Sequence, residues 1–226
     1  MKKRLLLIPI LIFVACETED SSDLPTETAI YQDYLVRFSE LDQATRLSAT
    51  FREQNEDGVR LKLSGDARLE ANSETVNYYS NAGNYFYRWE RNDFIDLSIE
   101  FSKNSSRTFT NVVNVEDKSS LTIVNTDTIA LSGGSLLTWT NPLLNNEHLD
   151  YRIQQGSQSG GSGYWKETGS TSLSIGDIIT GSLGQGPANL IISRSIEINQ
   201  LDQADGDPSN GRLIIEYETS YPIVLQ

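Results

Sequence analysis

Residues 46–63 read RLSATFREQNEDGVRLKL, and apolar side chains alternate with polar ones on both sides of a central turn. Leu47, Ala49 and Phe51 fall on one face of an extended strand, because successive side chains of a strand point to opposite faces. The pair Asp57-Gly58 is typical of a hairpin turn, and the alternation resumes after it. The stretch therefore predicts a β-hairpin with one buried face.

The same alternation recurs along the chain in short runs separated by Gly, Asn, Asp and Ser, without long helical periodicity. We therefore expect an all-β fold of two antiparallel immunoglobulin-like β-sandwiches, the first at residues 29–117 and the second at residues 118–226. One continuous larger sandwich is the alternative, because the charged segment between the two patterns is not a typical linker. The further strands that we expect are residues 67–71, 85–90, 94–101, 108–115, 121–131, 136–140, 149–154, 173–175, 190–198 and 211–218.

One segment of the second half carries a family resemblance. Residues 136–142 read LLTWTNP, and together with Tyr151-Arg152-Ile153 they resemble the second and third strands of fibronectin type III and related immunoglobulin-like domains. In that family the Trp packs in the core and the Pro opens a loop, so the resemblance implies a buried Trp139. It concerns the fold and carries no chemistry.

The first residues of the chain are typical of an export signal. Met1-Lys2-Lys3-Arg4 supplies a charged start, and an apolar run follows from Leu5 to Ala15. A helix that crosses a bilayer needs roughly 20 apolar residues. The shorter run therefore predicts a signal peptide, residues 1–15, that is removed after export.

Phe13-Val14-Ala15-Cys16 resembles the lipobox of bacterial lipoproteins, in which small residues precede a cysteine that is acylated and becomes the new N-terminus. The family usually has Leu where this chain has Phe13. The resemblance implies that Cys16, the only cysteine, carries palmitate-type acyl chains, and several such chains make a lasting anchor. We therefore expect a Gram-negative outer-membrane lipoprotein.

The residues that follow Cys16 are acidic and hydroxylated, and they read ETEDSSD. Such a segment buries no apolar surface, so residues 16–28 are expected to form a flexible, disordered tether. An acidic cluster at this place also resembles the surface-export signal of some Gram-negative lipoproteins, which implies display on the cell surface. A plain solvated linker is the alternative.

The charge of the chain argues against one class of partner. The net charge is −13 at pH 7, and removal of the signal peptide takes away Lys2, Lys3 and Arg4. An acidic protein repels phosphate backbones and lacks the basic patch that neutralises them, so nucleic acid is not an expected partner.

Candidate catalytic residues are few. His148 is the only histidine, and no nucleophile elbow accompanies it, so we interpret it as an ordinary surface residue. Glu90, Asp93 and Asp96 lie close together in sequence, but Glu90 and Asp93 flank an expected hairpin turn, where acids are common. We expect no enzymatic activity, and a glycoside hydrolase with paired carboxylates is the distant alternative.

A polar loop near the C-terminus offers oxygen ligands of the kind that Ca²⁺ prefers. Its candidate ligands are Asp202, Asp205, Asp207 and Asn210. The spacing is not that of an EF-hand, and the residues between them are ordinary turn formers, so a long polar hairpin is the alternative.

Aromatic residues give the remaining candidates for ligand contact, because exposed rings stack on sugars or anchor protein partners. Two pairs stand out, Tyr78-Tyr79 and Tyr164-Trp165. Tyr164 and Trp165 are adjacent, so in an extended chain they point to opposite faces and at least one is exposed. The segment Ser157–Gly163 before them is expected to be a flexible Gly/Ser loop.

These observations lead to one functional expectation and one rival. We expect a non-enzymatic lipoprotein that is held in the outer membrane by Cys16 and acts as a binding or accessory module of the cell envelope. The rival is a glycan-binding lipoprotein that uses its exposed Tyr and Trp side chains as stacking platforms. The expected partners are the membrane and an extracellular glycan or envelope protein.

Overall fold

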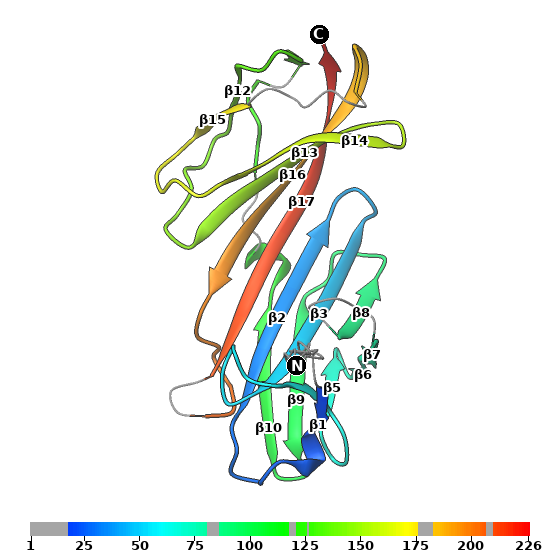
Figure 1. Cartoon of the computed structure of the whole chain (residues 1–226), viewed down its shortest axis with the longest axis vertical. Helices are drawn as coiled ribbons and strands as arrows, with labels where there is room; N and C mark the ends of the chain where they lie inside the picture. Colours follow the sequence, from blue (N-terminus) through cyan, green and yellow to red (C-terminus); the bar gives the residue numbers. More distant parts are fainter. Residues whose placement is uncertain (1–17, 81–85, 118–120, 126, 176–182, 207–209) are drawn as a thin grey trace, which may run out of the picture.

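The computed structural model describes residues 18–80, 86–117, 121–125, 127–175, 183–206 and 210–226. The expected all-β fold is confirmed: within these residues, strands are joined by turns and two short 3₁₀ helices (Figure 1). None of the helices described is long and apolar enough to cross a membrane. The elements are β1 (Thr18–Asp20), η1 (Ser21–Asp23), β2 (Ile30–Ser39), β3 (Ala44–Glu53), β4 (Arg60–Lys62), β5 (Arg68–Ala71), β6 (Glu74–Thr75), β7 (Asn77–Tyr78), β8 (Tyr87–Arg91), β9 (Leu97–Asn104), β10 (Arg107–Val113), η2 (Val115–Asp117), β11 (Thr128–Ile129), β12 (Ser135–Thr138), β13 (Glu147–Gln155), β14 (Gln158–Trp165), β15 (Ser172–Ile175), β16 (Gly186–Ile198) and β17 (Gly211–Leu225).

One large sheet runs through the whole molecule in the order β1-β4-β3-β2-β17-β16-β13-β14. Strand β8 also pairs with β3, and β7 pairs with β8. Two smaller sheets complete the structure, the four-stranded sheet β10-β9-β5-β6 and the two-stranded sheet β12-β15. The long strands β16 and β17 pair from Gly186 opposite Leu225 to Ile198 opposite Leu213, and β17 runs from the lower half of the molecule up to the C-terminus (Figure 1).

The hairpin predicted from residues 46–63 is confirmed. Phe51 of β3 lies opposite Leu61 of β4, and the Glu53 amide donates to the Val59 carbonyl at 2.9 Å. Gly58 closes the turn, because a Cβ atom there would lie 1.7 Å from the Glu53 carbonyl oxygen. Only glycine fits at such a close approach of backbone to backbone.

Strand β2, which the alternation did not predict, lies at the centre of the large sheet between β3 and β17. Its inward side chains are apolar except for Gln32, which is fully buried and accepts a hydrogen bond from the Tyr34 hydroxyl at 2.8 Å. The polar pair Gln32-Asp33 interrupts the apolar pattern, and this conceals the strand in the sequence.

The first hydrophobic core lies between the large sheet and the four-stranded sheet. Phe51 is at its centre, with ring centroids 4.7 Å from Phe101, 5.4 Å from Tyr87 and 6.2 Å from Tyr34. The Phe51–Tyr87 and Phe51–Tyr34 contacts are edge-to-face, an arrangement that aromatic quadrupoles favour. Tyr87 and Trp89 of β8 point inward, and both are buried in this core.

The second core lies between the other half of the large sheet and the pair β12-β15. Trp139 is 3% exposed within it, as the fibronectin type III resemblance implies. The other members of this core include Leu137, Leu149, Ile153, Leu173, Leu190, Ile192 and Ile223.

Strand β17 contributes to both cores. Leu213, Ile215 and Tyr217 belong to the first core, whereas Ile223 and Leu225 belong to the second. The strand also pairs in parallel with β2. The large sheet is therefore mixed, whereas the sequence predicted antiparallel sheets. The division into two domains at residue 117 stays a prediction.

The expectation of a disordered tether is wrong for its described part. Thr18–Asp20 pairs in parallel with Arg60–Lys62, and the Ser64 amide donates to Ser21 Oγ at 2.9 Å. Backbone pairing and hydroxyl hydrogen bonds need no apolar side chains, so an acidic composition did not prevent order here. Cys16 lies outside the described residues.

Replacement of Gly211 tests the β2–β17 junction. A Cβ at this position would lie 2.6 Å from the Gln32 carbonyl oxygen and 2.4 Å from Leu201 Cδ1. Gly211→Ala is therefore expected to lower the free energy of unfolding by about 1–3 kcal/mol, measured by urea denaturation. Gly184→Ala is the control, because nothing lies within 4 Å of a Cβ there. Equal stability of the two variants would contradict the close approach.

Candidate functional site

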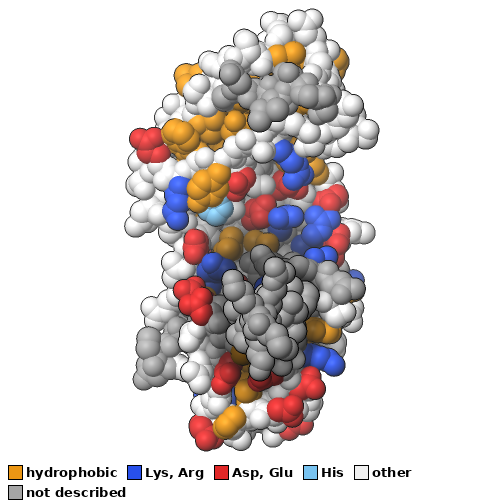
Figure 2. Space-filling view, in the orientation of Figure 1, with side chains coloured by type: hydrophobic (Ala, Val, Ile, Leu, Met, Phe, Trp, Pro, Cys, Tyr) orange, Lys and Arg blue, Asp and Glu red, His pale blue; other side chains and the backbone are white. Residues whose placement is uncertain are grey.

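The large sheet has two faces, and only the inner face packs against the cores. The opposite side, here called the outer face, is polar and partly exposed. Charged side chains of both signs gather across the middle of the molecule in the view of Figure 2. Strand register assigns to the outer face Asp33, Leu35, Arg37, Arg46, Ser48, Arg88, Glu90, His148, Asp150, Arg152, Ser193, Ser195, Glu197, Arg212, Ile214, Glu216 and Glu218.

The first predicted aromatic pair is divided between the two faces. Tyr78 lies opposite Tyr87 and packs inward, with its ring centroid 5.3 Å from Tyr87 and 5.8 Å from Phe86. Tyr79 is 48% exposed and lines a hollow on the outer face. Of these two tyrosines, the second is therefore the one that is available to a ligand.

The second pair is divided in the same way. Trp165 lies opposite Leu149, packs against the second core, and donates from Nε1 to Ser170 Oγ at 2.9 Å. Tyr164 lies opposite Asp150 on the outer face and is 56% exposed. The prediction that at least one of the two is exposed is confirmed.

The flexible loop expected at Ser157–Gly163 is instead most of strand β14, which pairs with β13. Its small residues have a packing role, since a Cβ at Gly163 would lie 2.3 Å from Tyr151 Cε1. Gly and Ser are common in linkers, and for this reason the composition misled the sequence prediction.

The hollow that Tyr79 lines has a volume of about 760 Å³. Arg46 lines it and donates to Glu90 Oε1 at 2.9 Å and to the Asp42 carboxylate. These hydrogen bonds raise the pKa of Arg46, and the bond from Arg46 lowers the pKa of Asp42. The hollow is lined by Leu35, Arg37, Arg46, Leu47, Ser48, Glu74, Thr75, Asn77, Tyr79, Arg88, Trp89 and Glu90.

A second hollow, of about 400 Å³, lies beside Tyr164. The Tyr164 ring is 5.1 Å from the His148 ring, and His148 Nε2 is 3.5 Å from Asp150 Oδ2. Burial raises the pKa of Asp150, and His148 opposes that shift. The hollow is lined by Asp150, Tyr151, Arg152, Ser162, Gly163, Tyr164, Ile191 and Ser193.

A row of directly opposed outer-face residues crosses six neighbouring strands, and its last three members line the first hollow. Its centre is an ion pair in which Arg37 Nη2 is 3.0 Å from Glu216 Oε2. In strand order from β13 to β8 the row is His148, Ser195, Glu216, Arg37, Arg46 and Glu90.

Sequence reasoning missed this row, although part of its signal was present. Arg46 and Ser48 alternate with Leu47 and Ala49, so the sequence places them on the side of the strand away from the core. Which strands lie side by side is set by pairing between distant segments, and local pattern does not report it.

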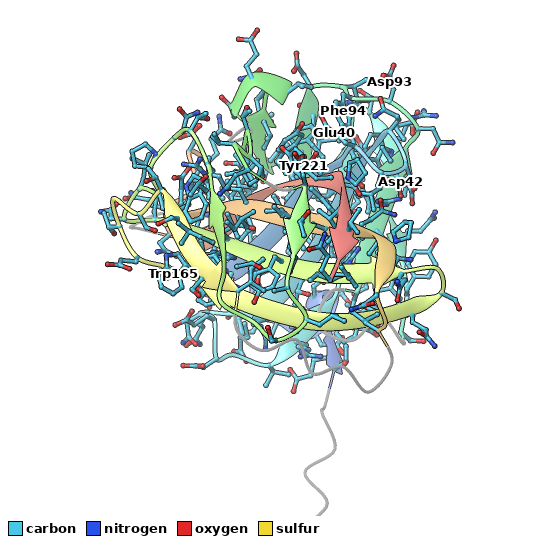
Figure 3. The ribbon with its side chains drawn as sticks, turned by 90° about the horizontal axis from the view of Figure 1, so that it is seen from above. Glu40, Asp42, Asp93, Phe94, Trp165 and Tyr221 are labelled. Carbon is cyan, nitrogen blue, oxygen red and sulfur yellow. The ribbon has the colours of Figure 1, made fainter. Side chains whose placement is uncertain are left out.

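The acids considered for glycoside hydrolysis have structural partners. Glu90 pairs with Arg46, Asp93 Oδ1 accepts from the Phe94 amide at 2.8 Å, and Asp96 Oδ1 accepts from the Val115 amide at 2.7 Å. In the view of Figure 3, Asp93 and Phe94 lie on the opposite side of the molecule from Trp165. The geometry therefore favours the turn interpretation of these residues.

The calcium candidates are not brought together in the described part of the chain. Asp205 is 1% exposed, and its carboxylate is 2.7 Å from Lys103 Nζ and 2.6 Å from Arg107 Nη2. Two cations beside a carboxylate disfavour a bound divalent cation. Asn210 donates to the Gln54 carbonyl, and Asp207 lies outside the described residues. The described residues contain no group of three or more His, Cys, Asp or Glu side chains that could hold a metal ion.

No family model matches the chain, and no curated protein is significantly similar to it.

Substitution of Asp205 tests the structural role of the former calcium candidate. Asp205 also accepts a hydrogen bond from the Ile30 amide at 2.9 Å, so it joins the loop to the start of β2. Asp205→Asn leaves Lys103 buried without its countercharge, and we expect a loss of about 3 kcal/mol in the free energy of unfolding. The exposed Asp202→Asn variant is the control. A large rise in the urea midpoint on addition of Ca²⁺ would contradict this assignment.

Proposed function

We propose that this chain is a lipid-anchored, non-enzymatic protein of the Gram-negative outer membrane that is displayed on the cell surface and binds an envelope or extracellular partner through its outer face. The observation that carries the proposal is the composition of that face. Tyr79 and Tyr164 are exposed near its two edges, and ion-paired side chains lie between them. Exposed aromatic rings in a polar setting are typical of binding surfaces.

The lipobox-like segment before Cys16 supports the anchor. The fold begins almost at this residue, because Thr18 already pairs with β4. A chain held through Cys16 therefore keeps its first strands close to the membrane and leaves little freedom between the anchor and the fold. This arrangement suits a protein that presents one fixed face to a partner.

The environment of the potential catalytic groups supports a binding role. The His148 ring packs on Tyr164, where it supports an exposed ring. The carboxylates of the outer face are held in ion pairs, among them Glu216 with Arg37, Glu218 with Arg152, and Asp33 with Arg212. Such pairs fix side-chain positions and suit recognition better than proton transfer at a reacting bond.

Fractionation of cells that express the full-length chain tests the anchor. The wild-type protein is expected in the outer-membrane fraction, whereas Cys16→Ala is expected to lose membrane association because it has no acylated residue. Ser22→Ala is the matched control, since it changes a neighbouring hydroxyl and leaves the cysteine in place.

Protease treatment of intact cells tests surface display in the same strains. Loss of the wild-type chain while a periplasmic marker survives is the expected result. Protection of the chain would contradict surface display, and membrane retention of Cys16→Ala would overturn the lipoprotein assignment itself.

A further inference from the structure

We infer that the outer face binds a linear, uncharged polysaccharide that lies across the strands, with one aromatic subsite at Tyr79 and a second at Tyr164. The inference rests on the proposed function, because it names the class of partner that the same face takes. Three features of the face support it: the two hollows, the row of opposed residues and the balance of charges.

The Tyr79 subsite has the size and composition of a sugar site. Its volume of about 760 Å³ lies within the roughly 300–1,000 Å³ that is typical of small-molecule sites. The Tyr79 ring supplies an apolar platform, and Thr75 and Asn77 beside it offer hydroxyl and amide groups. Glu74 is held in place because Trp89 Nε1 donates to its Oε2 at 2.9 Å. A fixed acceptor beside an aromatic platform is suited to sugar hydroxyls.

The Tyr164 subsite likewise combines an aromatic platform with neighbouring polar groups. The ring leans on His148 at 5.1 Å and 35°, so its outer surface stays available while its orientation is supported. The hydroxyls of Ser162 and Ser193 line the adjoining hollow. Arg152 also lines this hollow, and its Nη2 atom is 3.2 Å from Glu218 Oε2, which holds the guanidinium in place.

The separation of the two subsites indicates a long ligand. Tyr79 follows β7 and Tyr164 lies in β14, and six strands of the sheet lie between these two. At about 4.8 Å between neighbouring strands, the two rings are on the order of 30 Å apart once sheet twist is considered. A single sugar unit reaches one ring only, whereas a linear chain lies across both.

The charges of the face favour an uncharged chain. Arg37, Arg46 and Arg152 each have a carboxylate partner on the same face. The whole chain also has a net charge of −13, which repels a polyanion. The paired guanidinium and carboxylate groups still present hydrogen-bonding edges to hydroxyls. A neutral glycan therefore gains these contacts without the repulsion that an acidic glycan meets.

Affinity electrophoresis of the detergent-solubilised, lipidated protein tests the inference. The probes in the gel are mixed-linkage β-glucan, linear mannan and xylan, with polygalacturonate as the charged comparison. At least one neutral polymer is expected to retard the protein. For that polymer, Tyr79→Ala and Tyr164→Ala are each expected to weaken binding about tenfold or more.

Three comparisons sharpen the test. Tyr164→Phe keeps the ring and is expected to keep most of the binding, and Leu136→Ala, at a 54% exposed position in β12, is expected to change nothing. Oligosaccharides shorter than about half of the 30 Å span are expected to bind much more weakly than the polymer and to respond to only one of the two tyrosine variants.

Several results would overturn the inference. These are the absence of retardation by every neutral polymer, a preference for polygalacturonate, or retardation that neither tyrosine variant changes. Any of them, together with outer-membrane retention and protease sensitivity of the wild-type chain, would leave the surface lipoprotein proposal standing without this glycan site. Of the three, the absence of retardation by any polymer would indicate a protein partner. If the wild-type chain were not retained in the outer-membrane fraction, the proposed function itself would be rejected.

Discussion

The parallel pairing of β2 with β17 is the interaction on which the rest of the structure depends. It joins the first long strand of the chain to the last, from Gln32 opposite Gly211 to Ser39 opposite Glu218. The Glu40 amide extends the ladder by donating to the Glu218 carbonyl at 2.8 Å, and the Glu40 carboxylate accepts from Thr219 Oγ1 at 2.5 Å. Without this pairing, the inward side chains of β17 would leave the first core, and the outer face would be divided into two separate surfaces.

A buried ion pair lies where the two cores meet. Arg194 Nη2 is 2.5 Å from Glu147 Oε2, and both side chains are almost fully buried. Arg194 also donates to the carbonyl oxygens of Asn141 and Pro142, at 3.1 and 2.9 Å. Burial of two charges adds little net stability, but a pair with these additional hydrogen bonds disfavours other registers of β13 and β16. This polar junction separates two apolar cores while one sheet still connects them.

The sequence predicted those parts of the fold that depend on local pattern. Alternation identified β3, β9 and most of β16, because apolar residues recur at every second position through most of each strand. Arg194 is the inward polar exception in β16. It missed β2, where Gln32 takes an inward position, and β14, where Gly and Ser replace the expected apolar residues. Both strands are fixed by their neighbours more than by their own side chains.

The candidate site could be predicted only in part for the same reason. The adjacency of Tyr164 and Trp165 indicated that at least one of the two rings is exposed, and the structure confirms this for Tyr164. Tyr79 is exposed as well. The sequence could not show that both lie on one face, because that depends on the order of strands. Arg37 and Glu216, at the centre of the face, are 179 residues apart in the chain. The burial of Asp205 beside Lys103 is likewise a long-range contact that its own loop does not reveal.

One sheet joins both cores into a single cooperative unit and thereby keeps the outer face continuous. Urea unfolding of two single-tryptophan variants tests it most directly, because Trp89 reports on the first core and Trp139 on the second. In each variant, tryptophan fluorescence and far-ultraviolet circular dichroism are expected to change in one coincident transition. A Trp139 transition that is complete while most strand signal remains would contradict the claim and would indicate two independent domains.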